Sequence, residues 1–190
     1  MVANTYSSGN ISVNNGNGST CNNGSNINNG TCTISGNGNT TITVTGTPKQ
    51  AIKITSGTIQ SFDNSGTLKS LEIRGEGYNT SGTRVQNFKN TGTIITSVTG
   101  RNGAIADNFT NTGLISGEDR TIITGVDIKI SDSGGGTINN TGTITSKNMI
   151  IKSESSNAGS LTFTNSGSIS SNVQIGHTGN GSHTFTASNI

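Results

Sequence analysis

Residues 109–115 read Phe109-Thr110-Asn111-Thr112-Gly113-Leu114-Ile115, and this stretch decides the fold because the chain repeats it. The pattern is an aromatic residue or Ile, any residue, Asn, Ser or Thr, Gly, any residue, and Ile or Leu. Four further complete copies start at Phe62, Phe88, Ile138 and Phe163, and a degenerate copy starts at Phe185. Successive first residues lie 26, 21, 29, 25 and 22 positions apart. A motif that recurs at this period predicts a repeat architecture.

The two apolar positions of each copy lie six residues apart, so the alternation of a strand directs both toward the same side. Between them, Asn followed by Ser or Thr and then Gly supplies the chemistry of a tight bend. Asn and Gly tolerate positive φ, and the Asn amide bonds to neighbouring backbone. Each copy is therefore predicted to be the end of one strand, a bend and the start of the next strand.

Shorter alternating apolar pairs, such as Leu71 and Ile73, follow the copies and add further short strands. A unit of this length with two or three strands and no helical period is typical of one rung of a solenoid. We expect an all-β, right-handed parallel β-helix of roughly seven to eight rungs, in which each motif residue stacks about 4.8 Å from its counterpart. The Phe column and the Ile/Leu column then form a narrow core, and the Asn column forms an amide ladder.

The residues expected to build this structural repeat are the aromatic, Asn and Gly positions of the complete copies. They are Phe62, Asn64, Gly66, Phe88, Asn90, Gly92, Phe109, Asn111, Gly113, Asn140, Gly142, Phe163, Asn165 and Gly167. The alternatives are a β-sandwich and a disordered repeat. A β-sandwich would show turns about every 8–12 residues and would not show such columns.

The composition agrees with a thin-cored β structure. Gly, Thr, Asn and Ser make up 112 of the 190 residues, whereas hydrophobic residues make up 27% and charged residues 11%. Ordinary globular domains are about 45–50% apolar, so a helical bundle, a membrane span and a thick core are excluded. Disordered chains are usually rich in charge and Pro, but this chain has one Pro and many β-branched residues.

Charge argues against two classes of partner. The net charge is +2, and the eleven basic residues are scattered along the sequence without a run that could follow a phosphate backbone. We therefore expect no nucleic-acid partner. We also expect that this segment is not inserted in a membrane, because no apolar run is long enough to cross a bilayer.

The N-terminal residues 1–50 differ from the rest of the chain. They are rich in Asn-Gly steps and contain only faint copies of the repeat, around Ile27 and Ile42. We interpret residues 1–50 as an N-terminal cap or irregular rungs, and residues 51–190 as regular rungs truncated at the C-terminus. The first four residues have neither a charged nor an apolar stretch, so we expect no signal peptide in this segment.

Two cysteines, Cys21 and Cys32, are separated by ten residues that are almost all Asn, Gly, Ser and Thr. Such a loop brings its ends together easily, so the sequence predicts a local disulfide and an oxidising compartment. Two free thiols are the alternative. A zinc site is not expected, because no further ligands lie near the pair.

The recurring rungs Phe-x-Asn-[Ser/Thr]-Gly-x-[Ile/Leu], in a polar chain poor in Cys, resemble the passenger domains of bacterial autotransporters. The resemblance covers about residues 50–190. It implies a right-handed β-helix that is displayed on the bacterial cell surface or secreted, after export through the outer membrane by a C-terminal barrel that this chain does not contain. It implies adhesion to host cells or bacterial self-association. The partners would be a host-cell surface or matrix component, or the same protein on neighbouring cells; a fragment of a secreted cytotoxin passenger is an alternative.

No catalytic, cofactor-binding or metal-binding residue is expected. Residues 131–136 contain an Asp-Ser-Gly sequence like that of chymotrypsin-like proteases, but His177 and His183 follow it, in the opposite order to that family, so a Gly-rich loop is the better interpretation. The same two histidines lack a third metal ligand near them. A polysaccharide lyase or hydrolase remains an alternative, because such enzymes need clustered carboxylates and a base on one face. The candidates for that chemistry are Asp107, Glu118, Asp119, Arg120 and Asp127.

The function expected from the sequence is non-covalent adhesion or self-association. Flat Thr, Ser and Asn faces would hydrogen-bond a partner along the rod, and longer loops would supply specific contacts. The longest insertion between copies lies between Ile115 and Ile138, and a tolerated loop insertion is the alternative there. The candidate contact residues in it are Glu118, Asp119, Arg120, Asp127 and Lys129.

Overall fold

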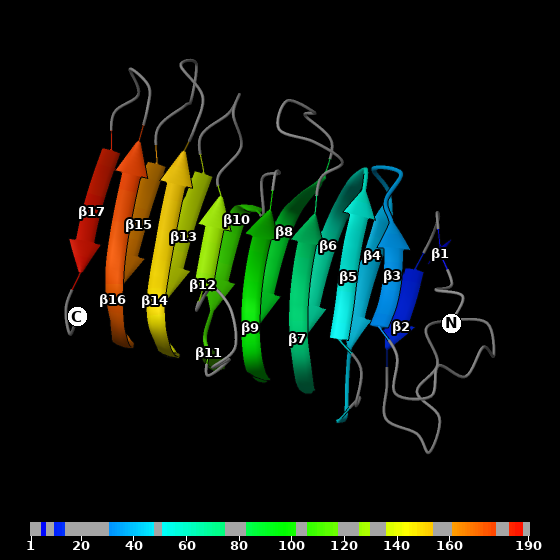
Figure 1. Cartoon of the computed structure of the whole chain (residues 1–190), viewed down its shortest axis with the longest axis horizontal. Helices are drawn as coiled ribbons and strands as arrows, with labels where there is room; N and C mark the ends of the chain where they lie inside the picture. Colours follow the sequence, from blue (N-terminus) through cyan, green and yellow to red (C-terminus); the bar gives the residue numbers. More distant parts are fainter. Residues whose placement is uncertain are drawn as a thin grey trace.

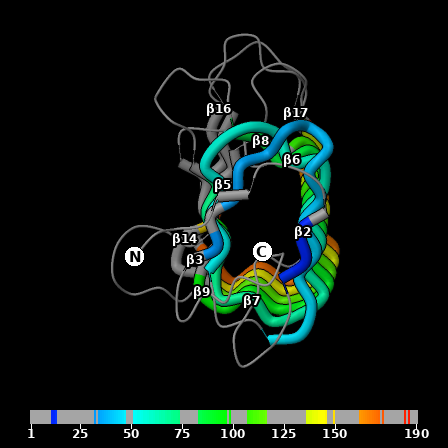
Figure 2. The backbone as a smooth tube through the Cα atoms, turned by 90° about the vertical axis from the view of Figure 1, so that its right-hand side faces the viewer, coloured from blue at the N-terminus to red at the C-terminus, as the bar shows by residue number. Residues whose placement is uncertain are grey.

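The chain forms an all-β solenoid of parallel strands. The computed structural model describes residues 5–6, 10–13, 31–47, 51–74, 83–101, 106–117, 126–129, 136–153, 161–177 and 183–187, and no helix occurs among them. The strands lie side by side along one axis (Figure 1). Viewed along that axis, the described turns of the backbone superimpose around a single interior (Figure 2).

The strands of the described residues are numbered in chain order, as labelled in Figure 1. They are β1 (Thr5–Tyr6), β2 (Asn10–Val13), β3 (Thr31–Ser35), β4 (Thr40–Val44), β5 (Ala51–Ser56), β6 (Thr58–Asn64), β7 (Thr67–Arg74), β8 (Arg84–Asn90), β9 (Thr93–Arg101), β10 (Ala106–Asn111), β11 (Leu114–Gly117), β12 (Val126–Lys129), β13 (Gly136–Asn140), β14 (Thr143–Ser153), β15 (Leu161–Asn165), β16 (Ser168–His177) and β17 (His183–Ala187).

The strands divide between two sheets. Sheet A joins β1, β3, β5, β7, β9, β11 and β14 in that order, with β12 paired to both β9 and β14, and β16 paired to β14. Sheet B joins β2, β4, β6, β8, β10, β13, β15 and β17. Each complete motif copy links the two sheets, as where β8 ends at Asn90 and β9 begins at Thr93. The predicted strand end, bend and strand start are therefore confirmed.

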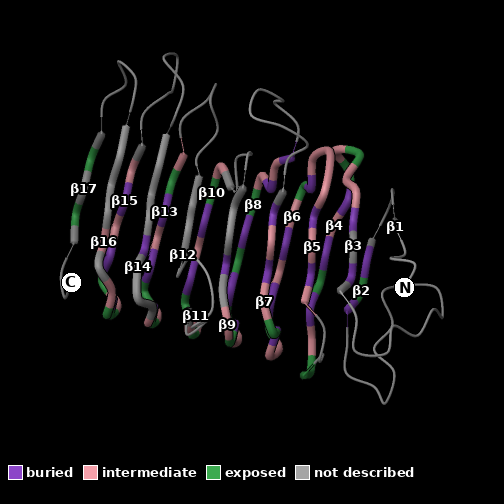
Figure 3. Tube along the Cα trace, viewed as in Figure 1, coloured by how far each residue is buried: buried purple, intermediate pink, exposed green. Residues whose placement is uncertain are grey.

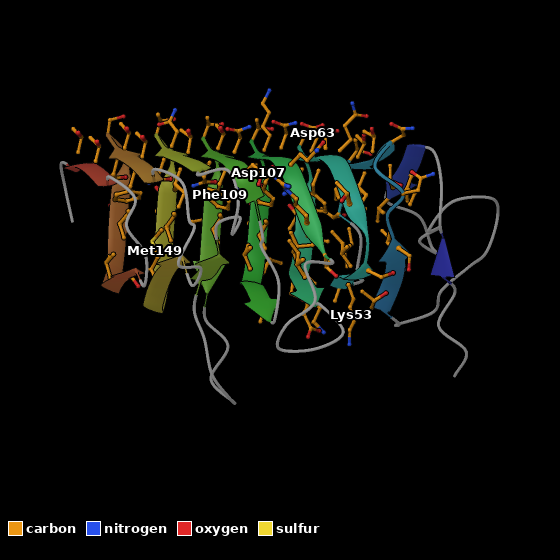
Figure 4. All side chains as sticks on the ribbon, turned by 90° about the horizontal axis from the view of Figure 1, so that it is seen from above. Lys53, Asp63, Asp107, Phe109 and Met149 are labelled. Carbon is orange, nitrogen blue, oxygen red and sulfur yellow. The ribbon has the colours of Figure 1, made fainter. Side chains whose placement is uncertain are left out.

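Motif residues from neighbouring rungs lie opposite one another in register and build the core. In sheet B, Phe62 pairs with Phe88, which pairs with Phe109. Their rings stack, with centroids 5.4 Å and 4.5 Å apart and planes within 6° of parallel. All three rings are buried, and Figure 3 shows buried and exposed residues alternating along the strands. Figure 4 shows Phe109 and Met149 between the two sheets.

The Asn positions form a second column inside the rod. Each amide nitrogen (Nδ2) donates to the Oδ1 of the Asn in the next rung at 2.7 Å, from Asn64 through Asn90, Asn111 and Asn140 to Asn165. All five side chains are buried. Because every amide points the same way, the ladder has a direction. Its first member, Asn64, lies opposite Val44, and its Oδ1 is buried without a hydrogen-bond partner.

The Phe column continues into the N-terminal region. Ile11 pairs with Ile42, and Ile42 pairs with Phe62, so this column runs through β2 and β4. Cys32 is buried and pairs in register with Ile52 of β5. Cys21 lies outside the described residues, so the Cys21–Cys32 disulfide stays a prediction, as does the division of the chain at residue 50.

The motif glycines are required for a different reason from the one that the sequence suggested. Among the described residues, positive φ occurs at Gly38, Gly46 and Gly57, and none of these belongs to a complete motif copy. The motif glycines instead lie against the preceding bend. The carbonyl oxygen of Gly92 accepts a hydrogen bond from the amide of Leu114 at 2.9 Å, and a Cβ on Gly113 would overlap that oxygen. Close approach between rungs, and not positive φ, therefore explains this column.

Candidate binding surfaces

The outer face of sheet B, together with the bends that follow its strands, carries rows of short polar side chains. From β10 onward the described side chains of these rows are all exposed or half-exposed, and none is charged. We term this surface the threonine face; it consists of Asn108, Thr110, Thr112, Thr137, Asn139, Thr141, Thr162, Thr164, Ser166, Thr184 and Thr186. Figure 4 shows the side chains of this sheet projecting outward in one layer. Because the registers align the residues across rungs, the hydroxyl and amide groups form a regular array.

The same sheet is charged nearer the N-terminus. Asp63 of β6 lies opposite Lys89 of β8, and Figure 4 shows Asp63 on the outer face. The uncharged part of the face therefore begins after β8. Thr, Ser and Asn side chains there are short, and Thr is stiff at χ1 because it is branched at Cβ. A partner would meet fixed hydrogen-bonding groups whose ordering costs little entropy.

The structure describes only part of the predicted contact cluster. Asp127 and Lys129 lie on β12, where their backbone positions are opposite Ile150 and Lys152 of β14. The other three predicted contact residues, Glu118, Asp119 and Arg120, lie outside the described residues. The structure therefore brings Asp127 and Lys129 into sheet A and gives no position for the rest.

The insertion that carries this cluster interrupts a strand of sheet A. Ile115 of β11 pairs with Ile94 of β9, and Val126 of β12 pairs with Val98 of the same strand. The neighbouring pairs of strands show a register shift near the same place, for example between Thr145 and Asn148 of β14. Strand pairing with β9 is therefore present on both sides of the insertion, at Ile115 and at Val126.

Of the groups considered for catalysis, the structure describes Asp107, Asp127, His177 and His183. Arg84 of β8 donates from Nε to both carboxylate oxygens of Asp107, at 2.9 Å to Oδ1 and 2.7 Å to Oδ2. Nη2 of Arg84 also contacts Oδ2, so the pair is bidentate and joins neighbouring strands of sheet B. His177 ends β16 in sheet A, whereas His183 begins β17 in sheet B. Residues 131–135 of the Asp-Ser-Gly segment lie outside the described residues.

Neither a metal site nor a membrane-spanning helix is present in the part of the chain that the structure describes. No group of three or more His, Cys, Asp or Glu side chains in the described ranges is arranged to hold a metal ion. No helix that is long and apolar enough to cross a membrane is present in the same ranges.

One surface was missed by the sequence analysis. Basic residues that are scattered along the sequence meet in one row of sheet A, because the register pairs Arg74 with Arg101 and Lys129 with Lys152. Comparison of the motif copies alone does not show this row. Arg74 lies six residues after Leu68 of its copy, whereas Lys152 lies eight residues after Ile144. The register shifts of sheet A account for the difference.

Comparison with known proteins identified no relative. No protein-family model matches the chain, and neither a curated protein nor a solved structure matches it.

Proposed function

We propose that this chain is a segment of an autotransporter passenger that acts in adhesion to host cells or in bacterial self-association, without catalysis. In this proposal the solenoid is a right-handed β-helix of roughly seven to eight rungs, exported through the outer membrane and exposed at the bacterial cell surface. The observation that carries the proposal is the threonine face. A flat, uncharged array of hydroxyl and amide groups, repeated at the spacing of the rungs, suits non-covalent contact along a rod.

The energetics of such a face favour an extended contact over a single strong site. Each exchanged hydrogen bond contributes only about 1 kcal/mol, because both partners are hydrated before they meet. The array offers eleven polar side chains on one side of the rod, so many weak bonds act together. A matrix polymer, or the same face of a second rod on a neighbouring cell, would meet these groups at many points.

The test is a pair of charged substitutions on the threonine face. Thr137 and Thr184 are both exposed on sheet B, and Thr137→Lys/Thr184→Lys would place two cations in the contact. Because burial of an unpaired charge is costly, we expect binding of protein-coated beads to epithelial cells and matrix proteins, or aggregation of the beads, to fall roughly tenfold or more.

Thr143→Lys is a control that adds a single charge outside the threonine face, because Thr143 is also exposed but belongs to sheet A. This variant should bind and aggregate like the wild type. Absence of both bead aggregation and cell or matrix binding by the wild-type protein would contradict the proposal. Equal loss in Thr143→Lys would show that the effect is non-specific charge and would reject the threonine face as the contact.

The predicted disulfide gives a further expectation for an exported protein. We expect neither Cys21 nor Cys32 to react with an alkylating reagent in denaturant until a reductant is added, as measured by intact mass. Reduction should lower the free energy of unfolding by about 2–3 kcal/mol, because the bond closes a short loop in the unfolded chain. Alkylation of both thiols before reduction would exclude the bond.

A further inference from the structure

A row of basic residues crosses four strands of sheet A. Arg74 of β7 pairs in register with Arg101 of β9, and Lys129 of β12 pairs with Lys152 of β14. The two pairs are joined by the contact of β9 with β12. There Val98 pairs with Val126, and each lies three residues before the basic residue of its strand. We term these four positions the basic row; it contains four of the eleven Lys and Arg residues of the chain.

The backbone places the basic row on the outer face of the sheet. Ile73 is buried, and successive residues of a strand belong to opposite faces, so position 74 belongs to the outer face. Met149 is also buried. Position 152 comes three residues later and therefore belongs to the opposite, outer face. Because paired strands lie about 4.8 Å apart, the row extends roughly 14 Å along the rod axis.

Among the described residues of β5, β7, β9, β12 and β14, the charges on the outer face near this row are mainly positive. Within the described strands, two acidic positions belong to the same face, Glu72 and Asp127, and each lies two residues before a basic position. Glu72 Oε2 lies 3.7 Å from Nζ of Lys53, a cation outside the row. Like charges placed directly opposite one another destabilise a sheet. A row of four cations therefore lowers the stability of the free protein, and an anionic ligand would relieve the repulsion between them.

We infer that the basic row binds a linear acidic polysaccharide that carries at least one anionic group on each sugar. Such a chain can lie extended along the rod, and its closely spaced carboxylates or sulfates match cations that recur at every rung. Arg and Lys bind these anions by charge-assisted hydrogen bonds. The inference rests on the proposed adhesive function, for which it names a class of ligand.

The described residues favour a polysaccharide over a single-stranded nucleic acid. Proteins that bind single strands stack the bases on accessible aromatic side chains. The aromatic side chains that the structure describes, Phe62, Phe88, Phe109 and Phe163, are all buried in the core. In the described part of the chain, the row therefore supplies a line of charge but no exposed aromatic ring on which a base could stack.

The test is direct binding of fluorescent polysaccharides to the purified chain, by anisotropy. We expect heparin and polygalacturonate to bind, with an affinity that falls as salt is added, and hyaluronan, which carries one carboxylate for every two sugars, to bind more weakly. Arg101→Gln/Lys129→Gln removes the two central charges and should weaken binding roughly 25-fold, at about fivefold for each charge. Lys69→Gln/Lys89→Gln is the matched control, since both lysines are exposed outside the row, and should change binding less than about twofold.

A gain-of-function variant keeps the test independent of any loss of folding. Gly176 of β16 lies opposite Lys152, so Gly176→Lys would extend the row to a fifth strand and should strengthen binding about fivefold. Equal effects of the row and control variants, binding of hyaluronan as tight as that of heparin, or tighter binding of single-stranded DNA would each overturn the inference. Thr137→Lys/Thr184→Lys should leave polysaccharide binding intact, so failure of the inference and failure of the proposed adhesion by the threonine face are distinguishable.

Discussion

Gly113→Ala should lower the free energy of unfolding by about 3 kcal/mol or more, the upper part of the range for overpacked sites. The added Cβ would overlap the carbonyl oxygen of Gly92 and would also meet the backbone of Thr91. Neither group can move away alone, because Gly92 O accepts the amide of Leu114 and Thr91 N donates to Asn64 O. Relief therefore requires two rungs to separate. Urea denaturation followed by circular dichroism measures the loss.

Two control substitutions separate this steric overlap from backbone strain and from the general effect of a substitution in the bend. Gly38 has φ of 92° and no atom within contact distance of an added Cβ, so Gly38→Ala measures backbone strain alone and should cost about 1–2 kcal/mol. Thr112→Ala alters an exposed neighbour in the same bend and should stay within about 0.5 kcal/mol of the wild type. A loss in Gly113→Ala no larger than that in Gly38→Ala would show that the bends do not approach as closely as described.

The seven-residue motif made the core of this fold predictable from the sequence. Its residues are contiguous, so the offsets from Phe to Asn and from Asn to Gly are the same in every copy. In-register stacking of one copy places the whole motif. The stacked rings of Phe88 and Phe109 and the ladder bonds of Asn111 follow from that register. The threonine face is on the same strands, and alternation from the buried Phe positions assigns it to the outside.

The glycine requirement and the basic row were not predictable in the same way. A local sequence reports which backbone angles Gly permits, whereas the overlap at Gly113 arises from a bend 21 residues earlier in the chain. The basic row lies beyond the bulges and the insertion of sheet A. In β9, Val98 comes four positions after Ile94. Their partners in the next rung, Ile115 and Val126, lie eleven positions apart. Only the strand pairing restores a common register.

Asn111→Leu should lower the free energy of unfolding by about 2–4 kcal/mol relative to the matched substitution Asn64→Leu at the end of the ladder. Asn111 accepts from Asn90 Nδ2 and donates to Asn140 Oδ1, both at 2.7 Å and both buried. Its loss leaves one donor and one acceptor without these partners. Each buried polar group that loses its hydrogen bond costs about 1–3 kcal/mol. Urea denaturation of the two variants measures the difference.

Asn64→Leu is the informative comparison because this substitution does not change the number of buried polar groups that lack a hydrogen bond within the ladder. Asn64 Oδ1 already lacks a hydrogen-bond partner, and the substitution removes that acceptor while it takes the donor away from Asn90 Oδ1. Both variants introduce the same apolar side chain in the same column, so changes in burial cancel in the difference. Equal losses at the two positions would mean that the amides contribute by packing alone. A larger loss at Asn111 would show that the one-way hydrogen bonding of the ladder holds the rungs in register.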